Sequence, residues 1–296
     1  MENINCPICK SSSYSKNSEF SRILGVKDPF NVVVCENCGL RSLQPQLTSN
    51  ELTDLYGDSY FNDNKLTNLK FDNLATSTHY ESDVKSRFSK FNLTLENFKR
   101  FNKNFTKMLD VGAATGDMVN IARKYGFNAE GIELSPYAIA KAKEKYNIVL
   151  MQKFLSDVGD NSFELIHLNH VFEHFNSPRI ELNHLNRILI VNGILYIEIP
   201  YQFHIVERLK YRFFSQPRPF TLHSIHHPYF YTVETIKSLV KSSGFEIIKL
   251  NVFSIKRYKD ETKGSWFKVF FWYILSLFGI GNYIELYAKK VSISNS

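Results

Sequence analysis

The four cysteines of this 296-residue chain all lie within its first 38 residues and form two close pairs. Cys6-Pro7-Ile8-Cys9 and Cys35-Glu36-Asn37-Cys38 are separated by 25 residues, a spacing typical of two metal-binding knuckles. Four thiolates in this pattern (Cys6, Cys9, Cys35 and Cys38) can hold Zn²⁺ tetrahedrally, and iron could occupy the same ligands. Because four sulfurs leave no open coordination position, we interpret the site as structural. Four unrelated free thiols are the alternative.

A glycine-bearing turn follows an apolar run near residue 110. Gly112, Ala114 and Gly116 stand between an expected strand and an expected helix, where glycines let the backbone approach a ligand closely. Glu133 ends the next expected strand, 23 residues after Asp110, and a carboxylate there can accept both hydroxyls of a ribose. The order of strand, loop, helix, strand and acid therefore predicts a nucleoside-binding site.

The residues around this loop favour one of two cofactors. A dinucleotide fingerprint has three glycines in the pattern G-x-G-x-x-G, whereas this chain has Gly112-x-Ala114-x-x-Asp117. A carboxylate at Asp117 would face a pyrophosphate unfavourably, but Asp110 and Asp117 suit the cationic amino group and sulfonium of S-adenosylmethionine. A tight turn that binds no ligand is the remaining alternative.

Strands and helices are expected to alternate between residues 105 and 200. The apolar patterns and caps indicate strands at 107–111, 129–133, 163–168 and 194–199, and helices at 116–125, 136–146 and 178–189. Such repeated units predict an α/β fold, a parallel sheet with helices on both faces. Beyond Pro200 we expect a helix at 232–243 and strands at 245–253 and 283–291.

At these positions the chain resembles the class I S-adenosylmethionine-dependent methyltransferases. Residues 109–116 (LDVGAATG) are similar to motif I of that family, and 169–174 (NHVFEH) to its strand-4 region. Residues 187–195 resemble its R-x-L-x-x-G-G-x-L segment, with Asn192 at the first of the two glycines. The resemblance implies a Rossmann-like sheet and a cofactor site formed by Asp110, Gly112, Ala114, Gly116, Asp117, Glu133, Leu134 and Asn169. The acid often seen after the third strand is missing, and Phe154 in that zone could stack on the adenine.

The N-terminal region extends the resemblance to zinc-ribbon methyltransferases, several of which act on sugars. We expect a zinc ribbon at 1–45, a helical linker or lid at 46–104, and the methyltransferase domain at 105–296, with acceptor-side elements in 201–296. The known sugar C-methyltransferases of this type have an extra C-terminal domain that this chain lacks, which favours O-methylation.

Methyl transfer to a hydroxyl requires a base, and Glu173-His174 is the first candidate. The pair follows the strand at 163–168, at the carboxyl end where parallel sheets bind ligands. We expect His174 to act as the base and Glu173 to orient its imidazole. The alternative is that both residues only line the cofactor site.

A second polar cluster lies at residues 223–231 (HSIHHPYFY) and resembles a stretch that closes over the acceptor in the family. His226 or Tyr229 could serve there as an alternative base. Its three histidines also allow a metal site, although no carboxylate shares their spacing, and a packed core turn is the third interpretation.

The net charge of +7 is concentrated in the last third of the chain. Residues 201–296 carry 14 basic and 6 acidic side chains, a net charge of +8, whereas residues 1–200 sum to −1. This argues against a chain coated for nucleic acid but allows a local basic surface. Four basic residues among aromatic ones suit a phosphate-bearing acceptor or form a solvated helix face: Arg208, Lys210, Arg212 and Arg218.

Residues 266–280 (WFKVFFWYILSLFGI) form the most apolar stretch, which is too short to span a bilayer. We expect a core helix between the last two strands. The alternative is an interfacial helix, with peripheral membrane contact through residues 256–280. Because no apolar run follows a basic start, we expect no secretory signal and a cytoplasmic protein, with the inner membrane face as an option.

These features together predict an S-adenosylmethionine-dependent methyltransferase acting on a small-molecule acceptor, a sugar hydroxyl of a nucleotide sugar, glycan or glycolipid. An RNA methyltransferase is the first alternative; the balanced charge of residues 1–40, with four basic and four acidic side chains, counts against it. A non-catalytic methyltransferase-like partner protein is the second, against which the intact Asp110, Gly112, Gly116 and Glu133 count.

Overall fold

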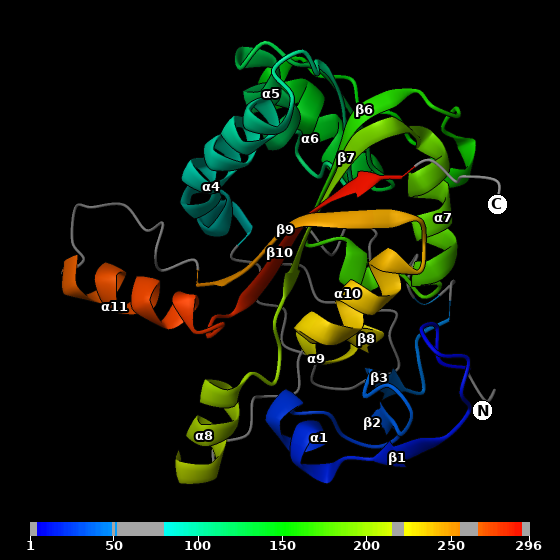
Figure 1. Cartoon of the computed structure of the whole chain (residues 1–296), viewed down its shortest axis with the longest axis vertical. Helices are drawn as coiled ribbons and strands as arrows, with labels where there is room; N and C mark the ends of the chain where they lie inside the picture. Colours follow the sequence, from blue (N-terminus) through cyan, green and yellow to red (C-terminus); the bar gives the residue numbers. More distant parts are fainter. Residues whose placement is uncertain (1–4, 49–50, 52–79, 215–221, 255–265, 292–296) are drawn as a thin grey trace.

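The computed structural model describes residues 5–48, 51, 80–214, 222–254 and 266–291. Its main sheet has six strands in the order β5-β4-β6-β7-β10-β9, of which β5, β4, β6 and β7 are parallel and β10 is antiparallel to both neighbours (Figure 1). The strands are β4 (Lys107–Val111), β5 (Asn128–Ile132), β6 (Phe163–Asn169), β7 (Leu189–Pro200), β9 (Phe245–Phe253) and β10 (Tyr283–Lys290). The expected strands and the Rossmann-like α/β fold are confirmed, although β7 begins earlier than expected, at Leu189.

Helices cover both faces of this sheet. Successive side chains of each strand point to opposite sides, and since both sets are apolar in β4 and β6, both faces must be covered. Met108 and Leu165 pack under the helices of one face, and Leu109 and Ile166 under those of the other. The first face carries α4 (Tyr80–Phe101), α5 (Asp117–Lys124) and α6 (Pro136–Tyr146); the second carries α7 (Pro178–Ile188) and α10 (Val233–Lys241).

Local capping explains where these helices begin and end. The Ser135 side chain accepts a hydrogen bond from the Ala138 amide, and Pro136 occupies the first turn of α6. Asn147 ends α6 in the left-handed conformation, with φ of 55°. The cap predicted at Ser135 is confirmed. Thr232 caps α10 in the same way, and the helix expected at 232–243 is found at Val233–Lys241.

A second, smaller sheet has the order β1-β2-β3-β8. Its strands are β1 (Tyr14–Lys16), β2 (Asn31–Cys35), β3 (Arg41–Gln44) and β8 (Tyr229–Phe230), with α1 (Ser18–Leu24) and α9 (Leu222–Ile225) beside it. Strand β3 pairs with β8, which comes from the last third of the chain. The small sheet therefore contains strands from both regions, and a separate apolar core beside it joins residues 20–47 with Phe203, Ile225 and Phe230.

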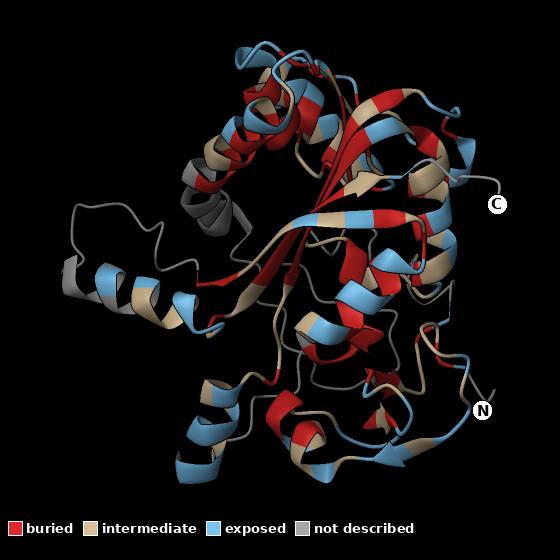
Figure 2. Cartoon of the chain, viewed as in Figure 1, coloured by how far each residue is buried: buried red, intermediate tan, exposed pale blue. Residues whose placement is uncertain are grey.

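Two helices extend from the same side of the body (Figure 1). They are α8 (Ile205–Phe214) and α11 (Trp266–Leu277). The expectation of a core helix at 266–280 is wrong, since none of the side chains described between Phe270 and Ile280 is buried (Figure 2). Among the side chains described there, Phe270, Tyr273, Leu277 and Phe278 are exposed. None of the helices that the structure describes combines the length and apolar character needed to span a bilayer.

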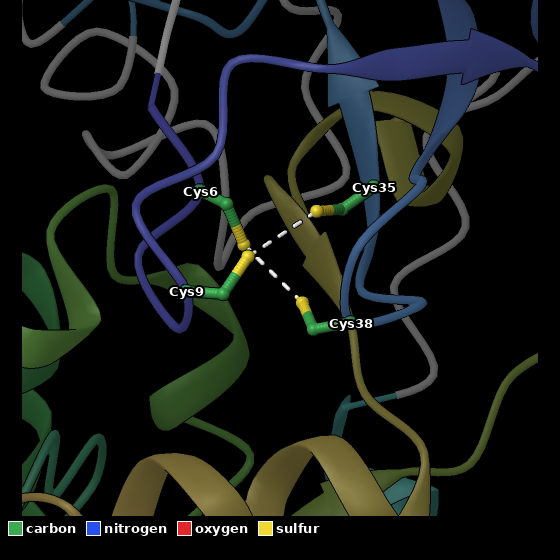
Figure 3. A group of neighbouring side chains, drawn as sticks. All are labelled: Cys6, Cys9, Cys35 and Cys38. Carbon is green, nitrogen blue, oxygen red and sulfur yellow. Dashed lines mark hydrogen bonds between the residues drawn. The ribbon is translucent and has the colours of Figure 1, made fainter.

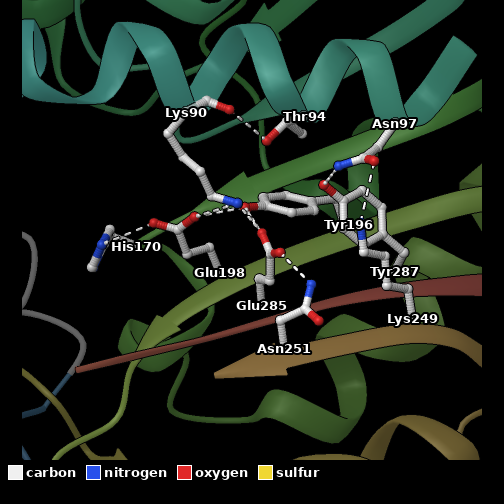
Figure 4. Close-up of polar contacts among 10 residues, drawn as sticks. All are labelled: Lys90, Thr94, Asn97, His170, Tyr196, Glu198, Lys249, Asn251, Glu285 and Tyr287. Atoms are coloured by element: carbon white, nitrogen blue, oxygen red, sulfur yellow. Dashed lines mark hydrogen bonds and ion pairs between the residues drawn. The ribbon is translucent and has the colours of Figure 1, made fainter. Parts of the chain in front are cut away.

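A buried charge network joins α4 to the middle of the sheet (Figure 4). The Lys90 ammonium is 1% exposed; it contacts the Glu285 carboxylate of β10 and lies 3.9 Å from Glu198 of β7. Tyr196 donates a hydrogen bond to Glu198 at 2.6 Å, and Asn251 donates one to Glu285 at 2.7 Å. These partners compensate the cost of burying three charges.

The pKa of Glu198 shows how strongly the network favours its charged form. Burial alone would raise this pKa, but the close approach of His170 and the charge of Lys90 lower it from 4.5 to about 2. A lowered folded-state pKa stabilises the fold above about pH 4.5, and this contribution is lost as the pH falls towards 2.

Replacing Lys90 with methionine should destabilise the protein strongly. The Lys90→Met substitution keeps the bulk of the side chain but leaves two buried carboxylates without their cation, and we expect a loss of about 3 kcal/mol or more in the free energy of unfolding. Urea unfolding followed by circular dichroism measures it. Arg100→Met is the matched control on the same helix, because the Arg100 side chain is exposed and pairs only with Glu96 at its surface.

An equal stability of Lys90→Met and the unchanged protein would contradict this account. The double variant Lys90→Met/Glu285→Gln should recover part of the loss, since it removes one of the two uncompensated charges.

Candidate functional site

The four cysteines lie together beside the small sheet (Figure 3). The Cys6 and Cys38 sulfurs are 3.4 Å apart, the Cys9 and Cys35 sulfurs are 3.5 Å apart, and all four lie within 4.8 Å of one another. All four are free thiols. A tetrahedral zinc–thiolate site has sulfurs about 3.8 Å apart, so this arrangement fits Zn²⁺ with a small adjustment.

Backbone turns hold each knuckle in a shape that suits a metal. The Gly39 amide donates to the Cys35 carbonyl at 2.9 Å, and Gly39 adopts φ of 74°, which glycine tolerates without strain. Burial would raise the pKa of Cys9, but hydrogen bonds from Asn37 and from the Ser11 backbone lower it to about 6.

One arginine of the main domain fixes the first knuckle. Arg179 of α7 donates from Nε to the Pro7 carbonyl at 2.8 Å and from Nη2 to the Ile8 carbonyl at 2.9 Å. Tyr229 of β8 donates to the Asn176 carbonyl at 3.2 Å, just before the same helix. The cysteine cluster is therefore held against the edge of the main sheet where the functional loops lie.

The loop after β4 has the geometry of a ligand-binding turn. Gly112 and Gly116 have φ of 64° and 76°, and Ala114 follows the same left-handed pattern at 46°. A side chain on Gly112 would begin 2.5 Å from Val171, in the loop after β6. One on Gly116 would begin 3.1 Å from Ala142 of α6. Glycine is required at both positions, because the backbone is left-handed and the space beside it is taken.

Glu133 comes directly after β5 and is fixed by backbone amides. Its Oε2 accepts from the Ala114 amide at 2.8 Å, and its Oε1 accepts from the Leu134 and Ser135 amides at 2.8 and 2.9 Å. The carboxylate is held at the glycine loop; the two lone pairs of Oε1 are used by amides, whereas Oε2 retains one acceptor site for a hydroxyl. Leu134 is exposed beside it.

The two aspartates of the loop are directed at protein side chains. Asp110 is buried and lies 2.7 Å from Nδ1 of His167 in β6. Asp117 is buried, accepts from Lys145 at 2.9 Å and from Thr115 at 2.5 Å, and also contacts the Tyr146 hydroxyl. Both carboxylates hold neighbouring elements in place, and their direct contact with a cofactor stays a prediction.

The other expected cofactor residues lie along the same edge. Asn169 is the last residue of β6, opposite Glu198 of β7. Phe154 is exposed and precedes the 3-10 helix η1 (Leu155–Asp157). An exposed aromatic ring at this edge is free to meet a flat ligand.

The acceptor-side residues gather into one cluster, with Glu173 and His174 in the 3-10 helix η2 (Phe172–His174). The ring nitrogens of His174, His226 and His227 lie within 4.8 Å of one another. Nδ1 of His174 lies 3.3 Å from the His226 carbonyl, and because a carbonyl oxygen can only accept, Nδ1 is the donor in this contact. The side chain of His223 lies outside the described residues.

Glu173 is a buried carboxylate that lies beside two imidazoles and has one oxygen without a hydrogen-bond partner among the described residues. It is 2% exposed, and its Oε1 lies 3.2 Å from His170 and 4.0 Å from His227. Its Oε2 has no hydrogen-bond partner among the described residues. A carboxylate therefore lies beside the histidines, although no carboxylate shares their spacing in the sequence. Three imidazoles and a carboxylate could hold a metal or shuttle a proton.

His170 connects this cluster to the buried charges of the sheet. Its two ring nitrogens lie 3.2 Å from Glu173 and 3.6 Å from Glu198, so it stands between the two carboxylates. Figure 4 shows its approach to Glu198. Sequence reasoning did not assign roles to His170, Glu198 or Lys90. The available signal was an acid within an apolar strand pattern, at Glu198 and at Glu285, since a buried acid requires a buried partner.

Comparisons with known proteins agree with this geometry. The family model described as "Methyltransferase domain" matches residues 80–250. No curated protein sequence matches the chain. Magnesium protoporphyrin IX methyltransferase from Synechocystis PCC 6803, with bound SAH, is similar in fold, with 12% identity, a TM-score of 0.50, and coverage of 74% of this chain and 90% of its own.

Two further solved structures are described as S-adenosylmethionine-dependent methyltransferases. The one from Mesorhizobium loti has 13% identity and a TM-score of 0.48, covering 70% of this chain and 99% of its own. The one from Archaeoglobus fulgidus has 16% identity and a TM-score of 0.45, covering 71% and 100%. Because the family model spans more than half of the chain, the protein belongs to the methyltransferase-domain family and is an S-adenosylmethionine-dependent methyltransferase.

Proposed function

We propose that the enzyme methylates a hydroxyl of a sugar-bearing small molecule, such as a nucleotide sugar, glycan or glycolipid, with His174 as the base. The observation that carries the proposal is the cluster of Glu173 and three histidines at the carboxyl edge of the sheet, one loop away from the glycine turn. The sugar class is supported by the resemblance of the cysteine ribbon to the zinc-ribbon methyltransferases.

The glycine loop fits S-adenosylmethionine. Gly112 and Gly116 have no side chain between the backbone and the edge of the sheet, and the remaining acceptor site of Glu133, on Oε2, suits a ribose hydroxyl. When bound, the cofactor supplies a methyl on a sulfonium, whose carbon–sulfur bond breaks as the acceptor oxygen attacks. Because this methyl is already activated, the protein has mainly to align the acceptor and remove its proton.

His174 is suited to remove that proton. The hydrogen bond from its Nδ1 to the His226 carbonyl keeps the lone pair on Nε2, which takes the hydroxyl proton as the new oxygen–carbon bond forms. Glu173, buried beside the neighbouring imidazoles, stabilises the positive charge that develops on the histidine cluster. The backbone carbonyl of His226 positions the His174 ring. The imidazole of His226, which belongs to the same cluster, is the alternative base.

The His174→Ala variant should lose methyl transfer but keep the cofactor. With tritiated S-adenosylmethionine and soluble extract from a host lacking the gene as acceptor source, we expect the initial rate of labelling to fall by roughly 10²–10⁴-fold. Cofactor affinity, measured by calorimetry, should stay unchanged. His184→Ala, in α7, is the control histidine and should label at the normal rate.

Unchanged labelling by His174→Ala would remove this residue from the mechanism. The metal content of the same variant tests the other use of the cluster. If the variant loses one metal ion per chain relative to the unchanged protein, the histidines bind a metal, and His174 acts as a metal ligand and not as a general base.

We further propose that the four cysteines hold one structural Zn²⁺ per chain. The Cys9→Ser/Cys38→Ser variant should lose that equivalent, measured by elemental analysis, because two neutral hydroxyls replace two thiolates. Hydrogen exchange should quicken across residues 14–44 and stay slow in β4 and β6. Ser12→Ala, at an exposed position between the knuckles, is the control.

A purified, fully folded protein without zinc or iron would contradict the structural-metal proposal. Iron in place of zinc would keep the ligand set and change the metal.

A further inference from the structure

The helix α8 presents an apolar stripe that nothing in the described structure covers. Ile205, Leu209 and Phe213 are spaced by four residues, so they lie along one side of the helix, and all three are exposed. Phe213, at the outer end, is 74% exposed. A monomeric protein rarely leaves large apolar side chains aligned in this way without a use for them.

The helix α11 and the turn after it carry a second exposed apolar surface. Phe270 and Tyr273 are exposed along the helix, and Leu277 and Phe278 at its end are 64% and 76% exposed. The helix has 12 residues, a length of about 18 Å, whereas a bilayer core is about 30 Å thick. It is long enough to lie along a membrane surface and too short to cross it.

Both helices stand away from the body of the molecule, on the same side in this view (Figures 1 and 2). Charge indicates the kind of surface that suits them. Lys210 and Arg212 are exposed next to the apolar stripe of α8, while Arg208 pairs with Glu19 at 3.2 Å. The chain from residue 201 onward carries a net charge of +8. Apolar side chains beside exposed cations match a membrane interface with anionic headgroups.

We propose that α8 and α11 bind peripherally to an anionic lipid surface, inserting Leu209, Phe213, Leu277 and Phe278 among the headgroups. The lysine and arginine of α8 remain at headgroup level, where each adds attraction to anionic lipid. In this proposal Lys210 and Arg212, which the sequence also suggested for a phosphate-bearing acceptor, bind anionic lipid headgroups. Arg218 lies outside the described residues.

Vesicle sedimentation tests the proposal on the full-length protein. We expect binding to vesicles of equal parts phosphatidylcholine and phosphatidylglycerol, and much weaker binding to pure phosphatidylcholine. Leu209→Ser/Phe213→Ser and Leu277→Ser/Phe278→Ser should each lower the partition coefficient about tenfold or more, since each removes two inserted apolar side chains. Lys210→Gln/Arg212→Gln should weaken binding to anionic vesicles and leave the weak binding to phosphatidylcholine unchanged.

The matched control is Val149→Ser/Ile180→Ser, which removes two exposed apolar side chains elsewhere on the surface; Val149 is 73% exposed. This control should bind anionic vesicles as the unchanged protein does. The serine variants of α8, of α11 and of the control should label soluble extract at the normal rate, because none of their substituted residues belongs to the cofactor or acceptor site. A failure of methyl transfer is therefore separable from a failure of membrane binding.

Three results would overturn the proposal. The first is an unchanged protein that stays in the supernatant with anionic vesicles. The second is binding that the two helix variants retain. The third is a dimer in sedimentation velocity that these variants dissociate, without vesicle binding, which would assign the surface to a second copy of the chain.

Discussion

The buried ammonium group of Lys90 is the constraint on which the arrangement of the core depends. It lies between carboxylates of two adjacent strands, Glu285 and Glu198, and each of the three is almost fully shielded from water. None of these charges can be buried alone without a large cost in solvation, so α4 must dock where its lysine meets both acids. The α4 helix is therefore placed by a specific charge contact as well as by its apolar side chains Phe91, Leu95 and Phe98.

The same charges reach the functional edge through His170. This residue follows β6 with φ of 55°, a left-handed conformation that costs a non-glycine residue about 1–2 kcal/mol. Its ring stands between Glu198 and Glu173, so the strained turn is held by contacts on both sides. The turn brings Glu173 and His174 back over the ends of the strands, next to the loop that contains Gly112.

The cysteine ribbon completes the other side of this edge. Because β3 pairs with β8, the ribbon holds the segment that carries His226 and His227, and Arg179 fixes the first knuckle to α7. If the cysteines hold the proposed zinc ion, its loss would act on the acceptor side of the site through the backbone, without any metal contact to the reacting groups.

Local sequence signals were sufficient for most of the fold. The strand at 245–253 and the helix opened by Ser135-Pro136 were placed to the residue, because capping and apolar periodicity are local properties. The pairing of β3 with β8 and the meeting of His174 with His226 and His227 join segments far apart in the chain, which no local pattern encodes. The apolar stretch at 266–280 was predicted to be a core helix, but its described side chains are not buried, since composition does not distinguish an apolar side chain that faces the core from one that is exposed.

Identification of the methylated molecule tests the central claim most directly. The purified protein, tritiated S-adenosylmethionine and extract from a host lacking the gene would be combined, and label would be counted separately in sugar-nucleotide, lipid, polysaccharide and RNA fractions. Gly112→Arg supplies the blank, because it fills the cofactor turn; Gly126→Arg is its control, at a left-handed glycine with open space beside it. The account predicts label in a sugar-containing fraction, absent with Gly112→Arg and retained with Gly126→Arg. Label confined to RNA, or an equal signal from Gly112→Arg, would contradict it.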